Sequence, residues 1–171
     1  LCQSKFVAKA KPFLDWVKWL TDCRNNYDKA TQWWAAGTYN SAQAAFDATA
    51  ADHLDLYKMA AYYIFMLRFG LVDSGERNVQ IKTYDGVHFH YEPWDMDIAM
   101  GNRNDGGIAF NPPVDRNTRL GAGYAISGRS ATTSNFLWDS LEGSNNWANV
   151  IVPAVSQALF TAGLTYENCI A

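Results

Sequence analysis

The sequence predicts an α+β fold, mostly α, in which helices flank a central β-hairpin. Two observations predict it. Apolar residues recur at helical spacing in several segments, whereas period-two alternation occurs on both sides of one Asp85-Gly86 pair, which is a typical hairpin signal. The elements follow the order helices, hairpin, long loop, helices, and this order is typical of α+β domains.

The first half of the chain contains two predicted helices, with one or two short helices expected between them in residues 25–50. Pro12 suits the first turn of a helix, and the apolar face that follows comprises Phe13, Trp16, Val17 and Leu20. A stronger helix is predicted over residues 52–69, apolar on most of its surface and therefore buried. Thr49 and Asp52 resemble the capping box that starts such a helix.

Two further helices are predicted near the end of the sequence. One carries Phe136, Leu137 and Leu141, with Ser134 as its cap and Gly143 at its end. The other covers about residues 147–162, with Pro153 as the site of a kink.

The hairpin register follows from its apolar residues. A two-residue loop would place Ile81 on the same face as His88 and His90. A three-residue loop, with Gly86 in the left-handed conformation, gathers the apolar residues of both runs on one face: Val79, Ile81, Val87, Phe89 and Tyr91. We therefore predict Ile81 opposite Phe89 and Val79 opposite Tyr91.

The chain is expected to be a single domain or a fragment of a larger protein, because it begins with Leu1 and ends on what looks like the start of an element. Four segments follow from the pattern. Residues 1–50 are a helical lead-in, residues 51–110 hold the core of helix, hairpin and acidic loop, residues 111–133 are a loop, and residues 134–171 form C-terminal helices.

Composition excludes several classes of protein. Apolar residues make up 49% of the chain and charged residues 18%, so the chain is globular. A net charge of −3 argues against sequence-specific nucleic-acid binding, and the longest apolar run is too short to cross a membrane. Three widely spaced cysteines indicate buried free thiols formed in a reducing cytoplasm. Aromatics, at 15%, serve either a large core or a protein interface.

A group of oxygen-bearing side chains surrounds the predicted hairpin. Asp73 follows the long helix, Asn78 comes five residues later, and Asp95 and Asp97 follow the second strand. Protein-kinase-like folds use this order: an Asp positions the nucleophile, while an Asn and a later Asp bind the metal that bridges the phosphates. Asn78, Asp95 and Asp97 are thus the predicted metal ligands. Asp73 is the catalytic candidate if the protein is an active enzyme.

The strand ends of an antiparallel hairpin lie side by side, so these acidic groups are expected to converge. Such groups repel one another unless a cation or a basic side chain compensates them, and Arg77 and Arg103 are the basic candidates. The sequence establishes no cofactor. Mg²⁺ and Ca²⁺ are the cations that these ligands suit. A second set, His88, His90 and Glu92, alternates along one strand and is either a metal comb or, more often, a solvated or interface face.

The motif that follows the hairpin resembles a known family. The turn Tyr84-Asp85-Gly86 and the run Pro93-Trp94-Asp95-Met96-Asp97-Ile98-Ala99-Met100-Gly101 are similar to the CotH kinase-like motif, a Trp-Asp-x-Asp followed by Gly. The stretch from about residue 52 to the end resembles tail (muzzle or nozzle) proteins of short-tailed crAss-like phages, including the segment Ser134-Asn135-Phe136-Leu137-Trp138-Asp139-Ser140-Leu141. The resemblance implies the C-lobe core of a kinase-like fold.

The resemblance further implies a virion protein, a structural component of a bacteriophage tail with a degenerate CotH kinase-like core. Its partners would be copies of itself and other tail subunits in a ring or tube, and the host bacterial cytoplasm would be the place of synthesis. Two departures bear on catalysis: no glycine-rich phosphate loop precedes Asp73, and the first 72 residues contain no Glu for a Lys–Glu pair.

Two other functions stay open from the sequence. One is an active CotH-like protein kinase or nucleotide-binding enzyme that uses Asp73, Asn78 and Asp95. The other is a calcium-dependent glycan-binding module.

Overall fold

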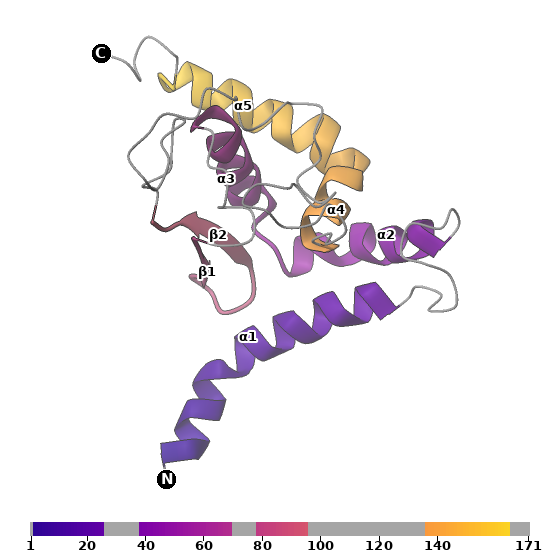
Figure 1. The fold of residues 1–171 in the computed structure, drawn as a ribbon, viewed down its shortest axis with the longest axis vertical. Coiled ribbons are helices and arrows are strands. Elements are labelled where there is room, and N and C mark those ends of the chain that lie inside the picture. Colours follow the sequence, from indigo (N-terminus) through magenta and orange to yellow (C-terminus); the bar gives the residue numbers. More distant parts are fainter. Residues whose placement is uncertain (1, 26–37, 70–77, 96–135, 165–171) are drawn as a thin grey trace, which may run out of the picture. The chain divides into compact units, whose positions relative to one another are not determined.

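The computed structural model describes residues 2–25, 38–69, 78–95 and 136–164 (Figure 1). Within these residues the predicted α+β class is confirmed, since helices accompany one two-stranded hairpin. The chain divides into two compact units. The first comprises residues 1–55 and 82–90, and the second comprises residues 56–81 and 91–171.

The first unit is built on α1 (Cys2–Asn25) and α2 (Thr38–Thr49), followed by the short 3₁₀ helix η1 (Ala50–Asp52). The prediction that Pro12 starts the first helix is wrong, because Pro12 lies inside α1. Proline has no backbone N–H to donate to the preceding turn, which favours a bend, and Figure 1 shows α1 changing direction along its length.

The buried stripe of α1 also differs from the predicted face. Trp16, Trp19 and Cys23 are buried, whereas Phe13 and Val17 are more than a third exposed. The spacing i, i+3, i+7 is still helical. The two indoles carry more apolar surface than their neighbours, so the helix turns them inward. They join the rest of this core: Ala42, Phe46, Ala50, Leu54 and Phe89.

Thr49 connects the two helices rather than capping the next one. The indole N–H of Trp19 donates to the Thr49 hydroxyl at 2.9 Å, and that hydroxyl donates to the Ala45 carbonyl at 2.9 Å. Thr49 makes no side-chain capping bond, so the predicted capping box with Asp52 is wrong. Cys23 is a buried free thiol as predicted, and burial raises its pKa.

His53 lies against this cluster. Its imidazole stacks on Trp19 with ring centroids 4.6 Å apart and planes 24° apart. Burial lowers the pKa of His53, an effect that His88 reinforces and Asp52 opposes. The unfolded state therefore binds more protons than the folded state as the pH falls below the usual histidine pKa of about 6.5.

We expect acidification from pH 7.5 to 5.5 to lower the free energy of unfolding by less than about 1 kcal/mol, because the His53 ring is only half-buried. Thermal melts at both pH values measure it. His53→Phe keeps an aromatic ring on Trp19 and removes the titration, so its pH dependence should be smaller. If this variant shows the same pH dependence as the unaltered protein, His53 is not the group that causes it.

The hairpin pairs β1 (Val79–Thr83) with β2 (Phe89–Pro93). The Trp94 amide donates to the Asn78 carbonyl at 3.0 Å, which sets Asn78 opposite Trp94 and Ile81 opposite Tyr91. The predicted pairing of Ile81 with Phe89 is therefore wrong by two residues. Because side chains alternate with period two, this shift leaves the odd-numbered residues on one face, as predicted.

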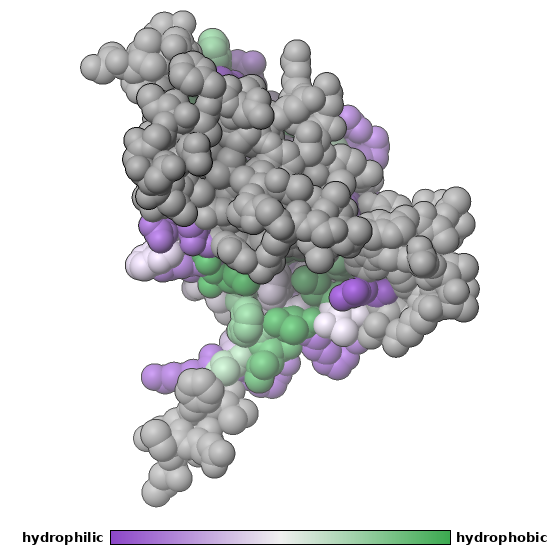
Figure 2. Space-filling view, viewed as in Figure 1, coloured by the Kyte–Doolittle hydropathy of each residue, from purple (hydrophilic) through white to green (hydrophobic). Residues whose placement is uncertain are grey.

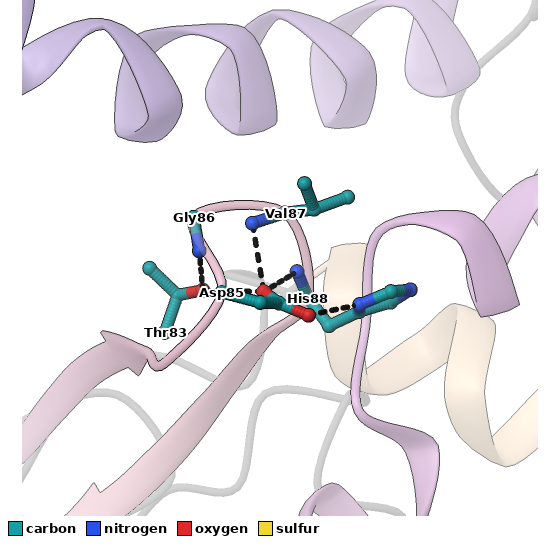
Figure 3. Close-up of polar contacts among 5 residues, drawn as sticks. All are labelled: Thr83, Asp85, Gly86, Val87 and His88. Atoms are coloured by element: carbon teal, nitrogen blue, oxygen red, sulfur yellow. Dashed lines mark hydrogen bonds and ion pairs between the residues drawn. The ribbon is translucent and has the colours of Figure 1, made fainter.

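Asp85 explains the shift. Its carboxylate accepts hydrogen bonds from the Val87 and His88 amides, both at 2.8 Å, and from the Thr83 hydroxyl at 3.0 Å (Figure 3). Its second oxygen pairs with Nδ1 of His88. These bonds draw residues 87 and 88 into the connection, which is longer than the predicted three-residue loop. The His88 side chain, followed by the two amides, holds the pKa of Asp85 well below its usual range.

Gly86 has φ +79°, as predicted, and an added Cβ would meet no atom within 4 Å. Gly86→Ala should therefore destabilise the protein by about 1 kcal/mol through backbone strain alone. Chemical denaturation measures this. Gly86→Asn should be tolerated better, since Asn enters the left-handed region more readily, and equal losses for both variants would contradict the explanation.

The second unit packs α3 (Leu56–Phe69) against α4 (Phe136–Gly143), η4 (Trp147–Ile151) and α5 (Val152–Thr161). The predicted helices of this half are thus confirmed, although the long one starts four residues later than residue 52. Trp138 is completely buried at the centre, with ring centroids of Tyr62, Tyr63 and Tyr91 5.7–6.3 Å away.

The helix predicted over residues 147–162 begins with a wide turn. η4 is π-helical, and the Val152 amide donates to the Trp147 carbonyl five residues back. Pro153, in the first turn of α5, offers no N–H to the Asn149 carbonyl, so an α-helical ladder cannot continue through it. The predicted interruption takes the form of this π turn.

Exposed apolar side chains lie on both units. Figure 2 shows hydrophobic residues along α1, where Phe13, Leu14 and Val17 are exposed. In the described ranges no helix is long and apolar enough to cross a membrane, in agreement with the sequence.

Candidate functional site

The open end of the hairpin brings two predicted site residues to neighbouring positions. Asn78 directly precedes β1, and Asp95 follows Trp94 after the end of β2. The 3.0 Å bond from the Trp94 amide to the Asn78 carbonyl joins the two strand ends here. The prediction that antiparallel pairing sets these ends side by side is confirmed for the backbone.

Both residues have an uncommon backbone conformation. Asn78 has φ +49° and Asp95 has φ +54°, and they are the non-glycine residues with positive φ in the described part of the chain. The left-handed region costs an L-residue about 1–2 kcal/mol, although Asn and Asp tolerate it best. Strained positions of this kind concentrate at binding and catalytic sites. Asn78 and Asp95 lie on the two sides of one hydrogen-bonded strand end. This open end of the hairpin is therefore the candidate functional site of the second unit.

The chemistry of the two side chains suits a hard cation. Asn78 offers an amide oxygen from a half-buried position, and the exposed Asp95 offers a carboxylate. Mg²⁺ and Ca²⁺ take such oxygen ligands, and Mg²⁺ retains several waters or phosphate oxygens. The residues present therefore fit one side of a magnesium site, with open positions left for solvent or phosphate. They also fit one side of a calcium site.

The other predicted members of the site, Asp73, Arg77, Asp97 and Arg103, lie outside the described residues. Their convergence with Asn78 and Asp95 stays a prediction. The left-handed conformation of Asn78 and Asp95 was not predicted from the sequence. The residue type was the one signal of it, since Asn and Asp are the commonest non-glycine residues in the left-handed region.

The alternating set of His88, His90 and Glu92 does not form a metal comb in the described structure. His88 bonds to Asp85, and His90 is buried with its ring stacked on Tyr84 at 5.2 Å. No group of three or more His, Cys, Asp or Glu side chains within the described ranges lies close enough to hold a metal.

Comparison with known proteins adds one finding. A family model described as CotH kinase protein matches residues 21–160, which include α2, α3, the hairpin and α4. No significant match was found among curated proteins or among solved structures.

Proposed function

This chain belongs to the CotH kinase protein family, and we propose that it serves as a structural component of a bacteriophage tail built on that family's core. The resemblance of the segment 134–141 to phage tail proteins is the observation that carries the proposal. Three of its apolar residues, Leu137, Trp138 and Leu141, lie in the core of the second unit. The similarity thus falls on residues that hold this unit together, and not on a surface loop.

Exposed aromatic side chains support assembly with copies of itself and with other tail subunits. Tyr57, Trp94 and Phe160, all in the second unit, are 53–64% exposed. Aromatic residues supply much of the contact energy in protein interfaces. In this proposal the protein is made in the host cytoplasm and then incorporated into the virion tail.

Electron microscopy of the native assembly tests the tail function. We expect a ring or tube, and antibodies raised against the chain should label the tails of intact virions. Replacement of Tyr57 and Phe160 together by Ser should weaken assembly. Lys18→Ser, at an exposed position of α1, serves as the control and should leave assembly unchanged. A chain that stays monomeric and is missing from virions would overturn the proposal.

The second candidate is an active CotH-like kinase or nucleotide-binding enzyme. The paired left-handed residues Asn78 and Asp95 favour it, because strain of this kind is typical of catalytic and ligand sites. In such an enzyme Asn78 and Asp95 would hold Mg²⁺ against the phosphates, and Asp73 would accept the proton of the hydroxyl nucleophile.

Calorimetric titration with Mg²⁺ and ATP separates the two functions. The tail protein should show no micromolar binding of Mg²⁺ and ATP together. The enzyme should show it, and Asp95→Asn should weaken it at least tenfold, while Trp94→Phe next to it should leave it unchanged. Asn78→Gly relieves the strained φ, so stability should rise while binding is lost.

A further inference from the structure

The connection between β1 and β2 contains an Asp-Gly pair, Asp85-Gly86, and such pairs undergo a spontaneous change of the main chain. The nitrogen of the glycine attacks the carboxyl carbon of the aspartate and gives up its proton, while one carboxyl oxygen leaves as water. Water then opens the succinimide ring, and the main chain continues through Cβ as isoaspartate. Glycine permits this reaction best, because it has no Cβ to shield its nitrogen.

The surroundings of Asp85 and Gly86 leave room for this reaction. The Asp85 side chain is 52% exposed, so water reaches the carboxyl group. No atom lies within 4 Å of the position that a Cβ on Gly86 would occupy, so this side of the glycine is open. The pair belongs to the connection and not to either strand, so no ladder of strand hydrogen bonds covers it. Steric protection of the pair is therefore small.

The hydrogen bonds of this connection oppose the reaction at the attacking nitrogen. The Gly86 amide donates to the Thr83 hydroxyl at 2.9 Å (Figure 3). The same hydroxyl donates to the Asp85 carboxylate at 3.0 Å. Thr83 thus holds both reacting groups, and the Gly86 nitrogen must leave this bond before it can turn toward the carboxyl carbon.

The bonds to the carboxylate oppose the reaction at the carboxyl carbon as well. Loss of water requires a protonated carboxyl group. The Asp85 carboxylate instead pairs with the His88 ring and accepts the Val87 and His88 amides at 2.8 Å, and all of these contacts stabilise its charged form. They hold the pKa of Asp85 well below its usual range, with the His88 side chain as the largest cause.

We propose that Asp85 is a modification site, which converts to isoaspartate when this connection opens and which the side chains of Thr83 and His88 protect in the folded protein. Isoaspartate adds one carbon atom to the main chain and carries its carboxylate directly on Cα. The carboxylate then no longer reaches the Val87 and His88 amides in the same geometry. Since these bonds set the length of the connection, the conversion removes the feature that fixes the pairing of β1 with β2.

Peptide mapping of the whole chain tests the proposal. The folded protein and the same chain unfolded in guanidinium chloride are incubated in parallel, and isoaspartate at Asp85 is measured by mass spectrometry with electron-transfer fragmentation. Trypsin separates this position from the Asp105-Gly106 pair, because Arg103 lies between them. We expect the folded chain to convert more slowly by about tenfold or more, since the reaction requires a local opening. Equal rates in the folded and unfolded chains would overturn the proposal, and this comparison needs no variant.

Variants test the roles of the two protecting side chains. Thr83→Val removes the shared hydroxyl, and His88→Gln removes the ring that pairs with the carboxylate. Each should accelerate the conversion in the folded state by about fivefold, the change expected when one stabilising hydrogen bond is lost. Val87→Ala is the matched control, because it keeps its amide and its side chain is 50% exposed.

None of these substitutions changes the Asp85-Gly86 pair itself, so all the chains should convert at the same rate in guanidinium chloride. Circular dichroism establishes that each variant is folded before the comparison. If the folded Thr83→Val and His88→Gln variants convert no faster than Val87→Ala, the two side chains do not protect Asp85 and the proposal is overturned.

Discussion

Trp138→Ala should lower the free energy of unfolding of the protein by about 3–5 kcal/mol, the range found when a fully buried indole is truncated. Trp138 has 0% exposure and packs among three tyrosine rings, so alanine leaves a cavity that no neighbour can fill without a backbone movement. Urea unfolding followed by circular dichroism measures the loss.

Trp94→Ala is the matched control, because the Trp94 side chain is 59% exposed. It should change stability by less than about 0.5 kcal/mol. Similar losses in the two variants would show that Trp138 is not the centre of the second unit.

Phe46→Ala should produce a loss of similar size, about 3–5 kcal/mol, in the first unit. Phe46 has 0% exposure and lies 5.7 Å from the Trp19 ring, between α1 and α2. The substitution should also alter Trp19 fluorescence in the folded state. Leu14→Ala, at an exposed position of α1, should be nearly neutral. A Phe46→Ala variant with unchanged stability would contradict this description of the core.

The fold class could be predicted because periodicity depends on local sequence. The helix over α3 and the alternating hairpin strands need only neighbouring residues to be recognised. The start of α1 could not be predicted in this way, because an interior proline is tolerated there and Pro12 alone suggests a helix start. The hairpin register was missed because Asp85 was taken as a turn residue, while its carboxylate accepts bonds from two later amides and lengthens the loop.

The candidate site was predictable to the extent that antiparallel pairing dictates it. Asn78 and Asp95 lie at joined strand ends, as expected from their positions on either side of the hairpin. The pairing of Leu54 with Phe89 could not be predicted, because a parallel bridge between segments 35 residues apart leaves no periodic signal in the sequence. Such contacts depend on how the whole core packs, and no short stretch of the sequence specifies them.

The π turn of η4 has a consequence for how this region tolerates change. A π turn holds one residue more than an α-helical turn, and each residue rotates a helix by about 100°. Deletion of Asn149 would shorten this turn to the length of an α-helical one, but it would swing Trp147 away from Tyr63 and from the Leu56 carbonyl, which its indole N–H now reaches at 3.2 Å. The extra residue thus sets the direction in which the Trp147 side chain points relative to the side chains of α5. Chain length in this turn is therefore constrained more strictly than side-chain identity, since Asn149 and Val150 are exposed and can be exchanged.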